Sequence, residues 1–87
     1  MLAKKEREAA AKGKGGLGKA ADDEPVFVLR ANDVCAPATV EAWADFVEAG
    51  IGAMVSGDET RAKVQEARSV AHLMRAWQAL NGSKFPD

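Results

Sequence analysis

The sequence predicts a small, mainly α-helical protein with two helices, one extended segment and a basic N-terminal arm. Three observations predict this class: the chain has 87 residues, its apolar residues keep helical spacing over two stretches, and only one short run favours a strand. We expect the arm to cover residues 1–24 and the helical domain to cover residues 25–87. Folds that need roughly 150 to 250 residues, such as a TIM barrel, are excluded by length.

The first helix is predicted at about residues 37–49. Its apolar residues recur at i, i+3, i+4 and i+7, which is the spacing of one buried helix face: Val40, Trp43, Ala44 and Val47. Pro37 suits the first turn of a helix because its φ is already helical. Gly50 is expected to end the helix in a left-handed conformation.

The second helix is predicted at about residues 57–80. Apolar residues keep helical spacing along it for more than four turns: Val64, Ala67, Val70, Ala71, Met74, Trp77 and Leu80. Ser56 and Glu59 have the spacing of a capping box, and Gly82 follows the predicted end. We interpret Trp43 and Trp77 as anchors of the core, or as contacts to a partner if the chain assembles.

The extended segment is predicted at residues 26–30, in the run Val-Phe-Val-Leu-Arg. A lone strand leaves its backbone groups unpaired. Three arrangements remain open: pairing with the same segment of a second copy, addition to a partner's sheet edge, or an irregular path across the helices. The candidate partner-binding residues are therefore Phe27, Val28, Met74 and Trp77.

The arm and the helical domain carry opposite charge. Residues 1–19 have a net charge of +4, the rest of the chain has −5, and the whole chain has −1. The stretch Gly13–Lys19 contains four glycines and predicts a flexible linker. The arm is interpreted either as a solubilising terminus or as a segment that orders on a protein assembly or on nucleic-acid phosphates. Its contact residues would be Lys4, Lys5, Arg7, Lys12, Lys14 and Lys19.

Residues with catalytic chemistry are sparse. The single cysteine, Cys35, is interpreted as a small buried residue, and the single histidine, His72, as a solvent-facing or rim residue. Glu41, Asp45 and Glu48 share one helix face and are interpreted as a solvated acidic surface. We therefore expect no enzymatic activity, metal site, cofactor or small-molecule substrate.

Part of the sequence pattern resembles small uncharacterised proteins from phage and prophage gene clusters. The pattern spans about residues 24–80 and consists of Glu24-Pro25-Val26-Phe27-Val28-Leu29-Arg30-Ala31-x-Asp33, Ala36-Pro37, Val40, Trp43-Ala44, Lys63-Val64-x-Glu66-Ala67-Arg68 and Met74-x-x-Trp77. The resemblance implies a small virus-related structural or accessory protein. It supplies no functional residues.

These features together predict a non-enzymatic interaction protein with a protein partner or a second copy of itself. Two alternatives remain: a nucleic-acid-associated regulator that uses the arm, and an inhibitor that docks an acidic helix face on a nucleic-acid enzyme. No apolar run reaches the ~18 to 20 residues of a membrane span, so we expect a soluble protein without a membrane partner. We expect it in the cytoplasm, or within a virion if it is phage-derived.

Overall fold

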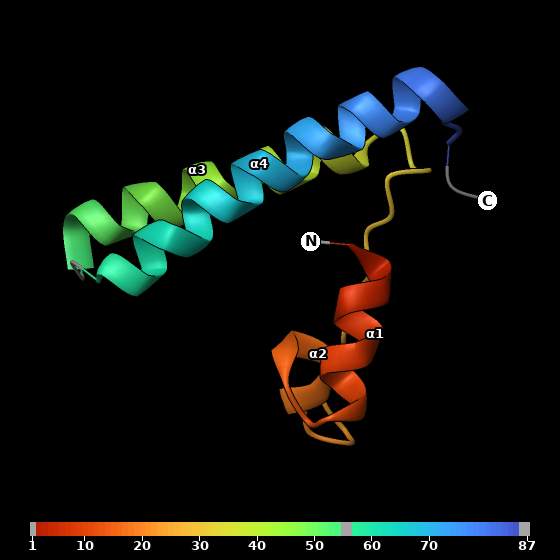
Figure 1. Ribbon diagram of the computed structural model, residues 1–87. Coiled ribbons are helices and arrows are strands. Elements are labelled where there is room, and N and C mark those ends of the chain that lie inside the picture. The colour runs from red at the N-terminus through yellow and green to blue at the C-terminus, as the bar shows by residue number, and fades with distance from the viewer. Residues whose placement is uncertain (1, 55–56, 86–87) are drawn as a thin grey trace.

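The computed structural model describes residues 2–54 and 57–85, with residues 51–54 described through their backbone alone. Within these ranges it contains four helices: α1 (Ala3–Ala11), α2 (Gly15–Lys19), α3 (Ala36–Met54) and α4 (Asp58–Asn81). α3 and α4 lie side by side as an antiparallel hairpin, whereas α1 packs on α2 (Figure 1). Among the described residues, neither α1 nor α2 packs against a helix of the hairpin. The mainly α-helical class predicted from the sequence is confirmed.

α4 begins and ends within one residue of its predicted bounds. Asp58 and Glu59 occupy its first turn, where carboxylates interact favourably with the helix dipole. Gly82 follows its last residue with φ 83°, a backbone conformation that glycine adopts without strain. Ser56, the predicted capping residue, lies outside the described residues.

α3 begins where predicted but extends beyond its predicted end. At the start, the Asp33 side chain accepts a hydrogen bond of 2.8 Å from the backbone N–H of Cys35. At the other end, the prediction that Gly50 terminates the helix is wrong, since α3 continues to Met54. An internal glycine costs a helix only about 1 kcal/mol relative to alanine, and no proline follows Gly50 to stop it.

The core between α3 and α4 consists of small side chains. Ala36, Ala44 and Ala71 are fully buried, and Val64 is the largest side chain that is almost completely buried. Small residues at a helix seam let the two backbones approach closely, but they bury little apolar surface.

The two tryptophans lie outside this seam. Trp43 is 50% exposed and Trp77 is 43% exposed. Their interpretation as core anchors is therefore wrong for the single chain, because the seam between two helices accepts only a narrow stripe from each.

The predicted strand at residues 26–30 is not present. The segment has no regular secondary structure, and Val26, Phe27 and Val28 are all exposed. A strand needs a partner, and the described residues contain none beyond an isolated bridge between Asp33 and Lys84. The segment also does not cover the helices, which was one of the expected arrangements.

The chain just before α3 is held by the end of α4 and the tail. The Gln78 side-chain amide donates hydrogen bonds to the carbonyls of Ala31 (2.9 Å) and Asp33 (3.0 Å). The backbone N–H of Val34 donates to the carbonyl of Lys84 at 3.0 Å. These contacts close the open end of the hairpin.

The arm contains two short helices that pack together. α1 consists of good helix formers, and α2 lies within the stretch for which a flexible linker is predicted. Gly18 permits the close packing, since a Cβ there would lie 2.9 Å from the carbonyl carbon of Gly13 and 3.0 Å from Cα of Ala10. The flexibility of the arm in solution stays a prediction.

Candidate interaction surface

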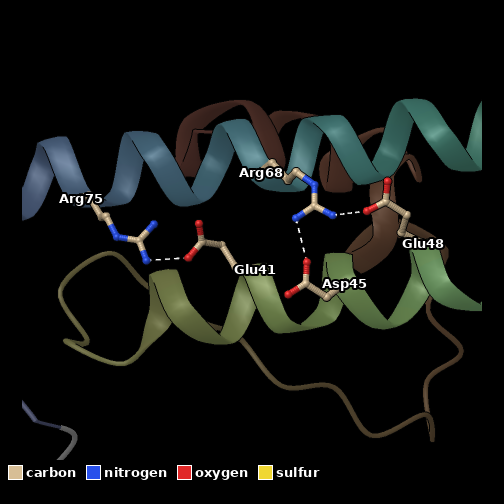
Figure 2. Close-up of polar contacts among 5 residues, drawn as sticks. All are labelled: Glu41, Asp45, Glu48, Arg68 and Arg75. Carbon is tan, nitrogen blue, oxygen red and sulfur yellow. Dashed lines mark hydrogen bonds and ion pairs between the residues drawn. The ribbon is translucent and has the colours of Figure 1, made fainter.

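One side of the hairpin is closed by ion pairs between the two helices. Arg68 of α4 lies between two carboxylates of α3, at 2.9 Å from Oδ1 of Asp45 and in contact with Oε2 of Glu48. About two turns toward the open end, Arg75 pairs with Oε1 of Glu41 at 2.5 Å. Figure 2 shows all five side chains projecting toward one another across the same side of the hairpin.

The ion pairs change the ionisation of their members. The hydrogen bond from Arg75 holds the pKa of Glu41 below its ordinary value of 4.5. Hydrogen bonds to Asp45 and Glu48 raise the pKa of Arg68, and the hydrogen bond to Glu41 raises that of Arg75. Glu41, Arg68 and Arg75 therefore keep their charged forms near neutral pH.

The three α3 carboxylates therefore do not form an unpaired acidic surface. Asp45 and Glu48 remain largely exposed, as predicted, but each has an arginine partner. The sequence analysis missed Arg68 and Arg75. Arg68 and Arg75 are seven residues apart, as are Glu41 and Glu48. This equal spacing was the signal in the sequence that two antiparallel helices could pair these residues with one another.

The opposite side of the hairpin is apolar. Residues two apart in a helix point about 200° apart, on nearly opposite sides. Trp43 is two residues from both Glu41 and Asp45, and Trp77 is two residues from Arg75. Since the charged residues close one side of the hairpin, both tryptophans lie on the other.

We call this surface the aromatic face. It consists of Trp43, Val70, Met74 and Trp77, of which Val70 and Met74 are half-buried. Phe46 (81% exposed) and Leu73 (55% exposed) lie two residues from the fully buried Ala44 and Ala71, so they point away from the seam at the outer edges of the hairpin. Contiguous exposed apolar residues are uncommon on the surface of a monomer.

The ion pairs also determine which residues lie at the same level of the two helices. Glu41 pairs with Arg75, and the helices are antiparallel, so two steps along α3 and two steps back along α4 place Trp43 level with Leu73. Three further steps in each direction place Phe46 level with Val70. Trp43 and Val70 therefore lie within about one helical turn of each other along the hairpin, and the aromatic face includes residues of both helices.

Two predicted partner-binding residues lie on this face and two do not. Met74 and Trp77 belong to the aromatic face, whereas Phe27 and Val28 lie in the extended segment. There they line a shallow depression of about 280 Å³ with Phe85 and four polar or charged residues. Phe46, which is 81% exposed, was not among the predicted site residues, and it points away from the seam.

The cations of the arm are all exposed. They are distributed over α1, α2 and the turn between them, and they comprise Lys4, Lys5, Arg7, Lys12, Lys14 and Lys19. Glu6 is half-buried, since its carboxylate lies against Gly15 of α2. The arm therefore presents mainly positive charge to its surroundings.

The remaining chemistry-bearing residues are dispersed. Cys35 is exposed, so its interpretation as a buried residue is wrong, whereas His72 is exposed as predicted. Within residues 2–54 and 57–85, no three histidine, cysteine or carboxylate side chains are grouped as metal ligands would be. None of the helices in the described part of the chain combines the length and apolar character that crossing a bilayer requires.

The fold and this surface define a class: a two-helix hairpin with one ion-paired side and one apolar side, preceded by a basic arm. Comparisons with protein-family models, curated proteins and solved structures find no match.

Proposed function

We infer that this protein is a non-enzymatic interaction protein that binds a protein surface through the aromatic face of its α3–α4 hairpin. The observation that carries the proposal is the exposure of the two tryptophans of this face, 50% at Trp43 and 43% at Trp77. Tryptophan and other large side chains in the middle of an interface contribute most of the binding energy. The expected role is that of a small structural or accessory subunit, and the sequence resemblance implies a phage assembly as its setting.

The ion-paired side of the hairpin supports this choice of surface. There, Arg68 and Arg75 satisfy the carboxylates of α3, so little unpaired charge is left for a partner. This weakens the alternative in which Glu41, Asp45 and Glu48 dock as an acidic face on a nucleic-acid enzyme.

Site-specific photo-crosslinking in cells that produce the chain tests the proposal. A photoreactive residue at position 43 should give a discrete protein adduct. The same residue at Gln65, which is exposed on α4 outside the aromatic face, should give none. Absence of an adduct at position 43, or equal labelling at both positions, would contradict the proposal.

A second candidate function is nucleic-acid binding by the arm, and the exposure of its six cations favours it. The arm contains no aromatic residue to stack on a base, so such binding would depend on phosphates and would be salt-sensitive.

Fluorescence anisotropy with duplex and single-stranded DNA at about 50 and 200 mM salt tests this candidate. Replacing Lys12, Lys14 and Lys19 together by Gln should weaken binding and reduce the salt slope by up to about 3. Replacing Lys63 of α4 by Gln is the control and should change neither. No binding at either salt concentration would refute this function.

A further inference from the structure

We propose that residues 24–30 pair with the same residues of a second copy of this chain, and that the two segments form an antiparallel β-ribbon. This surface is separate from the aromatic face, so the pairing goes beyond the proposed function and does not depend on it. Four features of the segment point to a second copy as its partner: unpaired backbone groups, the turns at its ends, opposite charges at these ends, and the position of its proline.

The backbone of residues 26–29 is unpaired. Within the described part of the chain, no hydrogen bond involves the N–H or the carbonyl of these residues. Figure 1 shows the segment as an irregular trace between the arm and α3, and Phe27 in its middle is 86% exposed. β-Branched and aromatic residues favour strands, and a strand with unpaired backbone groups is a template for pairing with another chain. The segment therefore has the composition and the free hydrogen-bonding groups of a strand that lacks its neighbour.

A turn bounds the segment at each end. The N–H of Glu24 donates to the carbonyl of Ala21 at 3.0 Å, and the N–H of Asp33 donates to the carbonyl of Arg30 at 2.9 Å. Residues 24–30 lie between these turns without a turn of their own, and Phe27 is the middle residue. Two such segments that run antiparallel and overlap fully therefore place Phe27 opposite Phe27 of the second copy.

The same overlap pairs opposite charges. The segment begins with Glu24 and ends with Arg30, so each glutamate lies opposite the arginine of the other copy. Charges of opposite sign that face each other stabilise an antiparallel pair, whereas like charges destabilise it. Within the described residues, the Arg30 side chain forms no ion pair or hydrogen bond, and Glu24 accepts one of 3.3 Å from the N–H of Ala21. A parallel pair in register would place like charges together, so the charges favour the antiparallel arrangement.

Pro25 determines which edge of the segment can pair. In a strand, the backbone groups of alternate residues point to the same edge, so Pro25 shares an edge with Phe27 and Leu29. Proline has no N–H, and a ladder along that edge would lack a donor. The other edge contains Val26 and Val28, which lie opposite each other in the ribbon and exchange both of their N–H···O bonds. Phe27 then belongs to a non-hydrogen-bonded pair, in which the two Cα atoms are about 4.5 Å apart.

The first test is the mass of the full-length chain in solution, measured by sedimentation equilibrium. A two-stranded ribbon is only marginally stable, so the mass should rise from 9.2 kDa toward twice this value as the concentration approaches about 1 mM. Glu24→Arg replaces two attractive pairs by repulsive ones and should weaken the dimer about 5- to 30-fold. Combining it with Arg30→Glu restores opposite charges and should restore the dimer. Glu66→Arg makes the same charge change at an exposed position of α4 and is the control.

A cross-linking test examines the register directly. In a Cys35→Ser background, Phe27→Cys should form a disulfide-linked dimer on mild oxidation, because Cα atoms about 4.5 Å apart are within the range that a disulfide spans. Val26→Cys in the same background is the control. Its equivalent in the second copy is a diagonal neighbour at about 7–8 Å, which a disulfide does not bridge without backbone movement. Failure of Phe27→Cys to cross-link, or equal cross-linking at both positions, would overturn the proposed register.

Two results of the mass measurement would also overturn the ribbon. The first is a wild-type mass of 9.2 kDa at every concentration up to about 1 mM. The second is a dimer that Glu24→Arg does not weaken, because it would show that the copies associate through another surface. Neither result bears on the aromatic face, since photo-crosslinking at position 43 reports on that surface independently.

Discussion

Truncation of Val64 measures how much the seam between α3 and α4 contributes to stability. Val64 is 2% exposed and is the largest side chain in the core. Val64→Ala removes two buried carbons, which costs about 1.6 kcal/mol in transfer free energy. The cavity left behind adds up to about 1 kcal/mol, and the better helix propensity of alanine returns about 0.5 kcal/mol. The expected loss in the free energy of unfolding is about 1–2 kcal/mol.

Urea unfolding followed by circular dichroism at 222 nm measures this loss. With a slope of about 1 kcal/mol/M for a chain of this size, the midpoint should fall by about 1–2 M. The control is Ser69→Ala, because Ser69 is exposed on the same helix and serine has a helix propensity close to that of valine. Both variants should be compared at one protein concentration, because any self-association would make the stability depend on concentration.

The comparison separates burial from helix propensity. Ser69→Ala should be neutral or stabilising by about 0.5 kcal/mol. Equal midpoints for the two variants would refute the reasoning, because they would show that Val64 is not packed against α3 in solution.

Three further predictions concern the ion pairs, the arm and the open end of the hairpin. The hydrogen bond from its arginine partner lowers the pKa of Glu41 below the ordinary value of 4.5. The pair therefore stabilises the fold at pH values above 4.5, and this stabilisation is lost as the pH falls through the pKa of Glu41 in the folded protein. Glu41→Gln should therefore flatten the decline in melting temperature between pH 5 and pH 3, and the exposed Glu66→Gln should flatten it less. Gly18→Ala should loosen the packing of α1 on α2 and speed trypsin cleavage of the arm, because the added Cβ would meet backbone atoms. Gly16→Ala is the control and should not change the cleavage rate, because nothing lies within 4 Å of a Cβ at that position. Gln78→Leu should remove two hydrogen bonds at the open end, cost about 1 kcal/mol, and speed amide hydrogen exchange before α3; unchanged exchange there would contradict the observed contacts.

The helices were predictable where local chemistry determines them. α4 has glycine after its last residue and no proline or internal glycine, so its bounds follow from the sequence. The end of α3 was not predictable from Gly50, since a single glycine is a weak terminator unless the chain adopts positive φ there, and Gly50 does not.

The predictions that were wrong concern features that depend on a neighbouring strand or helix. The segment at residues 26–30 has strand propensity, but propensity produces a strand only where another strand can pair with it. Likewise, helical spacing predicts which residues share a face of α3 but not how wide a stripe its neighbour covers. With one neighbouring helix, Ala44 is buried and Trp43 is not.

The size of the seam residues links these observations to function. Because Ala36, Ala44 and Ala71 fill the contact between the helices, the two backbones lie close together and leave no space for large side chains. The ion pairs of Arg68 and Arg75 then fix the register and close one side. The tryptophans, which do not fit the seam, lie on the opposite side, where they remain half-exposed. The small seam residues thus account for the exposure on which the proposed function depends.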